Sequence, residues 1–226
     1  MLSPVINSDL ELLILGILYI ALSWMVLPVF AVIIWILLIN PIYRGNVSYQ
    51  LINLMNFCNV AQCICHQFTG FFLIFPKFFA ENFPVDSGYL ITSYQIIGTT
   101  GNSAFLADFI ILTILSLVRM EISYFKVSGT QWTPWMIISL SVGGLYVLIT
   151  WLIGLITHNY NLIGPIWAFD VNVPFARSIL SVQMVIYYGS LSLSYVSYLI
   201  IIISIYKVSL TDNFSYQLLS EQDQRA

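Results

Sequence analysis

The sequence predicts an all-α transmembrane protein whose helices form a bundle. Of the 226 residues, 59% are hydrophobic and only 8% are charged, and the mean hydropathy is +0.90. Soluble domains carry about 25% charged residues, so this composition excludes an ordinary soluble fold. The apolar residues occur in blocks of more than about 20, the length needed to cross about 30 Å of hydrocarbon. With a net charge of -3, a nucleic-acid binder is also excluded.

Polar breaks divide the chain into five predicted membrane-spanning helices, at residues 12–39, 51–75, 89–118, 135–156 and 179–206. The spans are predicted as helices because uninterrupted apolar runs, such as residues 199–203, lack the alternation of barrel strands. We predict one transmembrane domain over residues 1–207, followed by a polar cytoplasmic tail at 208–226. The protein is therefore expected in the membrane as a multi-pass protein in contact with lipid.

The basic residues predict the orientation. If the N-terminus is outside, five of them are cytoplasmic: Arg44, Arg119, Lys126, Lys207 and Arg225. Only Lys77 and Arg177 then lie outside. The positive-inside rule favours this arrangement, with the C-terminus in the cytoplasm. The first apolar block lacks a basic leader and an early cleavage site, so we expect a retained anchor.

A stripe of polar residues runs along the second predicted span. Its members recur at steps of three or four and so share one helix face: Asn53, Asn56, Asn59, Gln62, His66 and Gly70. Amides facing lipid would leave their donors unsatisfied. The stripe is therefore expected to face other helices or a hydrated cavity. Two interpretations stay open: polar contacts that hold helices together, or a ligand or ion pathway.

Asp108 is an acidic residue deep within the third span. It lies about 16 Å along the helix from Arg119, which places it near the middle of the membrane. A carboxyl group there must pair, bind a cation or stay protonated. We expect Asn56 or Asn59 as its hydrogen-bond partner and favour a neutral, structural acid. Asp108 as part of a functional pathway is the alternative.

The sequence gives no indication of a metal, a cofactor or an enzyme. Cys58, Cys63 and Cys65 lie in one helix and cannot form bridges with each other. Cys63, Cys65 and His66 suggest metal binding, but adjacent helical positions point in different directions and no complementary pair exists elsewhere. No catalytic triad, zinc-protease motif or phosphate loop is present.

Several motifs, in order and spacing, resemble those of nematode serpentine chemoreceptors, most closely class T (Srt) of the rhodopsin-like seven-helix superfamily. They are Asn40-Pro41-Ile42-Tyr43-Arg44, His66-Gln67-Phe68-Thr69-Gly70, Ser116-Leu117-Val118-Arg119-Met120-Glu121-Ile122, Trp135 with Tyr146, and Trp167-Ala168-Phe169-Asp170. The resemblance covers about residues 11–207. It implies that the five spans correspond to the first five helices of a serpentine receptor.

The resemblance also implies a function, a chemosensory G-protein-coupled receptor for an unidentified small molecule. The ligand would lie among the second, third and fifth spans and the segment 158–178. Four polar residues in the outer or middle thirds of their helices are the predicted ligand contacts: Gln95, Asn102, Gln183 and Tyr187. Arg119 lies at the cytoplasmic end of the third span, within the motif that resembles the end of the third helix in these receptors. The alternative is that Arg119 only anchors the helix at the membrane interface.

The chain also departs from the family. Val118 stands where many relatives have Asn, and a sixth and a seventh span are missing from the sequence. We therefore expect a truncated or incomplete member without independent signalling. The competing class is a non-signalling membrane protein, either a partner subunit of a full-length receptor or a small transporter. Co-purification with a full-length receptor would favour the partner subunit.

The predicted orientation can be tested with an epitope tag placed after Ala226. Because the basic residues place the C-terminus in the cytoplasm, antibodies should label the tag only after the cells are permeabilised. A tag placed before Met1 serves as the control and should be labelled on intact cells. Labelling of the C-terminal tag on intact cells would reject the orientation.

Overall fold

The computed structural model describes residues 9–82, 89–125, 129–163 and 166–223. Its elements, in chain order, are α1 (Asp9–Ile39), α2 (Pro41–Arg44), α3 (Val47–Ile74), α4 (Pro76–Asn82), α5 (Tyr89–Phe125), α6 (Pro134–Thr157), β1 (Tyr160–Ile163), β2 (Ile166–Phe169) and α7 (Ala176–Asp223). Of the described helices, five are long and apolar enough to cross a membrane, namely α1, α3, α5, α6 and α7. The predicted all-α transmembrane bundle is confirmed, with one small β-hairpin added to it.

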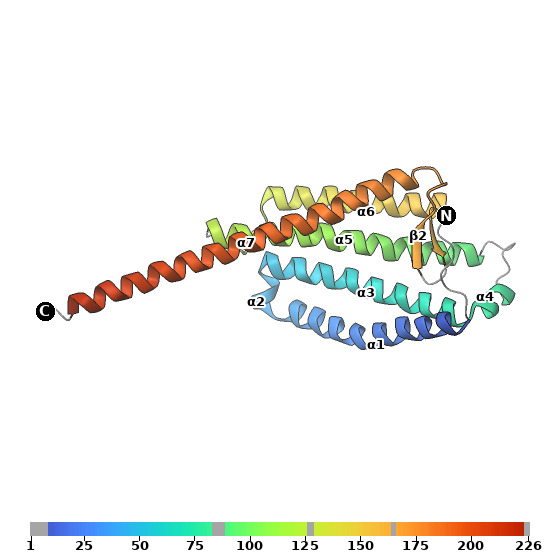
Figure 1. Cartoon of the computed structure of the whole chain (residues 1–226), viewed down its shortest axis with the longest axis horizontal. Coiled ribbons are helices and arrows are strands. Elements are labelled where there is room, and N and C mark those ends of the chain that lie inside the picture. The colour runs from blue at the N-terminus through green and yellow to red at the C-terminus, as the bar shows by residue number, and fades with distance from the viewer. Residues whose placement is uncertain (1–8, 83–88, 126–128, 164–165, 224–226) are drawn as a thin grey trace.

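The five long helices are arranged around α5. Helices α1, α3 and α5 lie side by side in that order, and both α6 and α7 pack against α5 (Figure 1). Successive long helices run in opposite directions, so the bundle has two distinct ends (Figure 1). We call them the hairpin end, where β1 and β2 lie, and the α2 end. As the helix with three long neighbours, α5 is the element on which the site depends.

Local sequence explains where several helices begin. Asn40 and Asn46 precede α2 and α3, and each side-chain oxygen accepts a hydrogen bond from the backbone N–H two residues later, at 3.0 and 2.9 Å. This is the role of an N-cap residue, which satisfies a donor that the helix itself leaves free. Proline occupies the first position of α2 and α6, where it costs no hydrogen bond.

Two helices extend further than the sequence predicted. The third span, predicted to end at residue 118, continues to Phe125, and the fifth, predicted to end at residue 206, continues to Asp223. The expected polar tail therefore begins as a continuation of α7. Residues 207–223 contain neither proline nor glycine, so nothing in them breaks a helix once it leaves the apolar segment. Figure 1 shows α7 projecting well past the α2 end of the bundle.

The apolar core lies toward the α2 end, between α3, α5 and α6. It is made of buried aliphatic and methionine side chains: Val47, Leu51, Ile111, Ile114, Leu115, Val118 and Met136. The indole Nε1 of Trp132 donates a 2.8 Å hydrogen bond to Oε1 of Gln50 and links α3 to the segment before α6. In contrast, most side chains of α1 are exposed apolar groups, as expected of a helix that faces lipid along much of its surface.

Glycines allow α1 and α3 to approach closely near the hairpin end. A Cβ atom added to Gly16 would lie 2.9 Å from the carbonyl oxygen of Gly70, and one added to Gly70 would lie 2.7 Å from that of Gly16. Only residues without a side chain fit such a crossing. Close backbone approach at small residues is a common mode of helix packing in membranes, because apolar surface alone gives no preference for helix over lipid.

We expect Gly70→Ala to destabilise the protein. Its new methyl group must displace the backbone of α1, and overpacking of this kind costs about 1–3 kcal/mol. Gly144→Ala is the matched control, because a Cβ there meets nothing within 4 Å, and it should leave stability unchanged or raise it through helix propensity. Thermal unfolding in detergent measures both, and equal melting temperatures for the two variants would contradict the close crossing.

Candidate functional site: a cavity between α3, α5 and the hairpin

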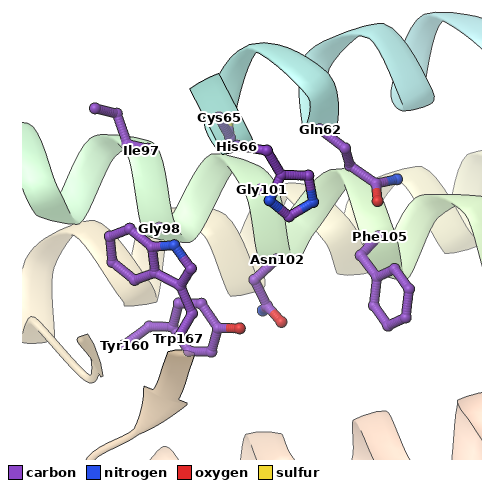
Figure 2. Close-up of a pocket in the computed structure, with 10 residues that line it drawn as sticks. All are labelled: Gln62, Cys65, His66, Ile97, Gly98, Gly101, Asn102, Phe105, Tyr160 and Trp167. Atoms are coloured by element: carbon purple, nitrogen blue, oxygen red, sulfur yellow. The ribbon is translucent and has the colours of Figure 1, made fainter. Parts of the chain in front are cut away.

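The hairpin between α6 and α7 forms one wall of the site. Helix α6 ends at Thr157 and is capped by His158, which adopts a left-handed conformation with φ 52°, and β1 begins two residues later at Tyr160. In the hairpin Tyr160 pairs with Phe169, and Leu162 pairs with Trp167. The rings of Tyr160 and Trp167 stack with centroids 5.9 Å apart and an interplanar angle of 8°. This pair of aromatic rings is directed toward the bundle (Figure 2).

Trp167 is fixed to both α3 and α5. Its Nε1 donates a 2.9 Å hydrogen bond to the hydroxyl of Thr69, which is fully buried. Its ring lies against Gly98 so closely that an added Cβ would be 2.3 Å from Cζ3. Glycine at position 98 is therefore required for the indole to cross over α5. The hydrogen bond satisfies the one polar atom of the indole in an otherwise apolar setting.

Beneath this indole lies a cavity of about 200 Å³, which we call the inner cavity. Its walls come from three elements (Figure 2): Gln62, Cys65 and His66 of α3, Ile97, Gly98, Gly101, Asn102 and Phe105 of α5, and Tyr160 and Trp167 of the hairpin. Aromatic and aliphatic surface is combined with two amides, an imidazole and a phenol. Such a mixture suits a small neutral molecule that both donates and accepts hydrogen bonds.

Two polar side chains that line the inner cavity, His66 and Tyr160, have further contacts outside it. The imidazole of His66 stacks on the ring of Tyr19 from α1, with centroids 5.3 Å apart. Burial, together with the nearby phenol of Tyr19, raises the pKa of Tyr160 to about 12. Tyr160 is therefore a neutral phenol at physiological pH and can donate as well as accept a hydrogen bond.

Asp108 is connected to the inner cavity through Gln62. The side-chain Nε2 of Gln62 donates a hydrogen bond to Oδ2 of Asp108, at 2.5 Å. The partner predicted from the sequence, Asn56 or Asn59, was wrong, because α3 and α5 are in an axial register that brings Gln62 opposite the carboxyl group. Asn56 is buried, and its Nδ2 has no hydrogen-bond partner in the described structure, as is true of Oδ1 of Asp108.

The four predicted ligand contacts lie in different places. Asn102 lines the inner cavity. Gln95 lines a separate cavity closer to the hairpin end. Gln183 of α7 is 1% exposed and accepts a 3.3 Å hydrogen bond from the hydroxyl of Tyr187. The ring of Tyr187 contacts Phe105, at 5.3 Å between centroids, so it lies behind a wall of the inner cavity rather than in it.

Sequence reasoning missed several residues that form the inner cavity. Sequence reasoning considered Cys65 for disulfide and metal chemistry alone, and it did not select Phe105 or Tyr160 for the site. A signal for the hairpin was present, since two four-residue runs that contain aromatic and β-branched residues, at 160–163 and 166–169, flank Gly164-Pro165. The turn residues themselves lie outside the described residues.

Arg119 contacts α7 near the α2 end. Its Nη1 donates a 3.0 Å hydrogen bond to the hydroxyl of Tyr198, and one turn earlier on α5 the hydroxyl of Ser116 donates to that of Ser194, also at 3.0 Å. Glu121 accepts a 3.3 Å hydrogen bond from Nε1 of Trp135 on α6. This end of α5 is thus linked by side chains to both α6 and α7.

In the described part of the chain, no group of three or more His, Cys, Asp or Glu side chains could hold a metal ion. Comparison with known protein families and with curated proteins gave no match for the chain.

We expect Asp108→Asn to leave the melting temperature nearly unchanged in sodium-free buffer. The amide keeps an oxygen that accepts the hydrogen bond from Gln62, and a neutral acid in hydrocarbon has no charge to lose. Thermal unfolding should also be the same with and without added sodium chloride, at constant ionic strength with choline chloride as the control. Stabilisation of the wild type by sodium, absent in Asp108→Asn, would show instead that the carboxylate binds a cation.

Proposed function

We propose that this protein is a receptor-like chemosensory membrane protein that binds a small neutral molecule in the inner cavity. The observation that carries the proposal is the combination, within one cavity of about 200 Å³, of a stacked Tyr160–Trp167 pair with the amides of Gln62 and Asn102. Aromatic walls with a few convergent polar groups are typical of small-molecule sites. An engineered apolar cavity of about 150 Å³ holds benzene, so a ligand of one ring with a polar substituent is the expected size.

The chemosensory part of the proposal rests on the motifs shared with serpentine chemoreceptors. In that assignment the N-terminus is outside, the hairpin end faces the exterior, and a dissolved ligand reaches the inner cavity past the hairpin. The α2 end, with Arg119 and the projecting part of α7, then faces the cytoplasm, where a G protein or a full-length receptor is the proposed partner.

Benzamide is a suitable probe, since its ring can stack on the aromatic wall and its amide can bond to Asn102 and Gln62. In lipid nanodiscs, benzamide should raise the melting temperature of the wild type. In Asn102→Leu the affinity should fall about tenfold, the effect of losing one hydrogen bond of about 1.4 kcal/mol. Dissociation constants are obtained from the dependence of melting temperature on benzamide concentration.

Ser103→Ala is the matched control for this experiment. Ser103 is adjacent in sequence and buried, but it is not among the residues that line the inner cavity. Its affinity for benzamide should equal that of the wild type. If Asn102→Leu binds benzamide as tightly as Ser103→Ala does, the inner cavity is not the binding site.

A further inference from the structure

A second cavity, of about 340 Å³, lies closer to the hairpin end and is called here the outer cavity. Helix α3 shows the order of the two cavities along the bundle. Cys65 and His66 line the inner cavity, Thr69 holds the indole of Trp167, and Phe72 and Leu73 line the outer cavity. These three groups of residues follow one another along α3 at intervals of about one helical turn. The indole of Trp167 therefore lies between the two cavities. The outer cavity is thus a separate space with its own walls.

The walls of the outer cavity are largely apolar. Leu12 of α1, Phe72 and Leu73 of α3, and Leu162 of β1 contribute to them. The ring of Phe72 packs edge-on against Tyr94, with centroids 4.3 Å apart, and makes one side aromatic. Apolar walls of this kind do not hold water well.

One buried atom in this cavity's lining lacks a partner. Gln95 is 3% exposed and lines the outer cavity, and its Oε1 has no hydrogen-bond partner in the described structure. Its Nε2 donates a 2.6 Å hydrogen bond to Oδ1 of Asn161, whose Nδ2 donates in turn to the backbone oxygen of His158 at 3.2 Å. If the Gln95 amide were rotated by half a turn, its Oε1 would contact Oδ1 of Asn161, and two acceptors would face each other. Rotating the Asn161 amide as well would only move the conflict, because its Oδ1 would then face the backbone oxygen of His158. The relay therefore fixes Oε1 as the free acceptor.

We propose that the outer cavity is a second binding site, for a neutral molecule with an apolar body and one hydroxyl or N–H group that donates to Oε1 of Gln95. A buried acceptor without a donor costs about 1–3 kcal/mol, so a ligand that supplies the donor gains both this hydrogen bond and the apolar contact. A charged amine is disfavoured because none of the described residues that line the cavity is acidic.

The adjoining cavity suggests the route to this site. This third cavity, of about 260 Å³, shares Leu12, Leu73 and Pro76 with the outer cavity, and Asp9 and Lys77 are among the residues that line it. Charged side chains mark the end of the bundle that meets water. The site therefore opens toward the polar surface at the hairpin end, while Leu12 on the lipid-facing α1 also gives it a border with the bilayer.

The test compares 4-methylphenol with 4-methylanisole, which has the same ring and an ether in place of the hydroxyl. The full chain is placed in phosphatidylcholine nanodiscs, whose lipid has no hydroxyl or N–H donor, and binding is measured by ligand-observed NMR with empty nanodiscs subtracted. The phenol should bind about tenfold more tightly, a difference of about 1.4 kcal/mol. Equal binding of the two probes, or binding of neither, would overturn the proposal.

Variants then locate the site. Gln95→Leu should reduce the preference for the phenol, whereas Gln183→Leu, which alters another buried glutamine with an unpartnered amide atom, should keep it in full. Leu73→Trp fills the outer cavity and should abolish the phenol binding that depends on Gln95, so adding Gln95→Leu to Leu73→Trp should weaken phenol binding no further. Leu73 does not line the inner cavity, so this variant separates the two sites, and benzamide binding should persist in it. An undiminished preference for the phenol in Gln95→Leu, or a further loss of phenol affinity when Gln95→Leu is added to Leu73→Trp, would overturn the proposal. The comparison of probes on the wild type stands even if a variant fails to fold.

A hydroxyl donor can come from the water phase or from the bilayer. Repeating the measurement in nanodiscs that also contain cholesterol, an apolar molecule with one hydroxyl group, distinguishes these sources. Displacement of 4-methylphenol by cholesterol assigns the site to a lipid, and undiminished binding assigns it to dissolved molecules.

Discussion

Hydrocarbon offers no hydrogen-bond partners, and this constraint decides where the polar side chains of the bundle lie. Many amides and hydroxyls are buried between the helices, among them Asn56, Thr69, Gln95, Ser116 and Gln183, while most of the exposed surface of α1 is apolar. The contacts that result, such as Gln62 with Asp108 and Ser116 with Ser194, join different helices. Because lipid competes equally well for apolar surface, these polar contacts and the close glycine crossings give the helices their specific partners.

The same constraint explains why both cavities lie near the hairpin end. Toward the α2 end the space between α3, α5 and α6 is occupied mainly by aliphatic side chains, and the cavity of about 230 Å³ beside Gly143 and Gly144 is lined almost entirely by apolar groups. Toward the hairpin end the helices carry glycines and amides, and aromatic rings from outside the membrane segment fill part of the space between them. Trp167 can do this only because Gly98 leaves room for its ring and Thr69 accepts its N–H. The hairpin thus connects α6 to α7 and also supplies walls of both cavities.

The sequence predicted the five spans, because they follow from hydropathy. It also predicts, from helical periodicity and rise, a shared face for the polar stripe and the depth of Asp108 in the membrane, and these stay predictions. It did not predict which stripe residue meets Asp108. Asn56, Asn59 and Gln62 lie on one face, so the choice depends on the axial position of α3 against α5. That position depends on close contacts such as Gly101 against Cys65, which periodicity does not contain. The extent of α7 was missed because the loss of hydropathy after residue 206 was taken as the end of the helix, although nothing there interrupts the backbone.

Helix α7 has a mechanical consequence. Its 48 residues would span about 72 Å, more than twice the hydrocarbon thickness of about 30 Å. A continuous helix resists twisting and bending because each turn is hydrogen-bonded to the next. A small rotation where Tyr187 touches Phe105 would therefore be carried along the helix and would move its far end. The packing of Tyr187 behind the inner cavity is thus mechanically connected to the end of α7, about ten turns away.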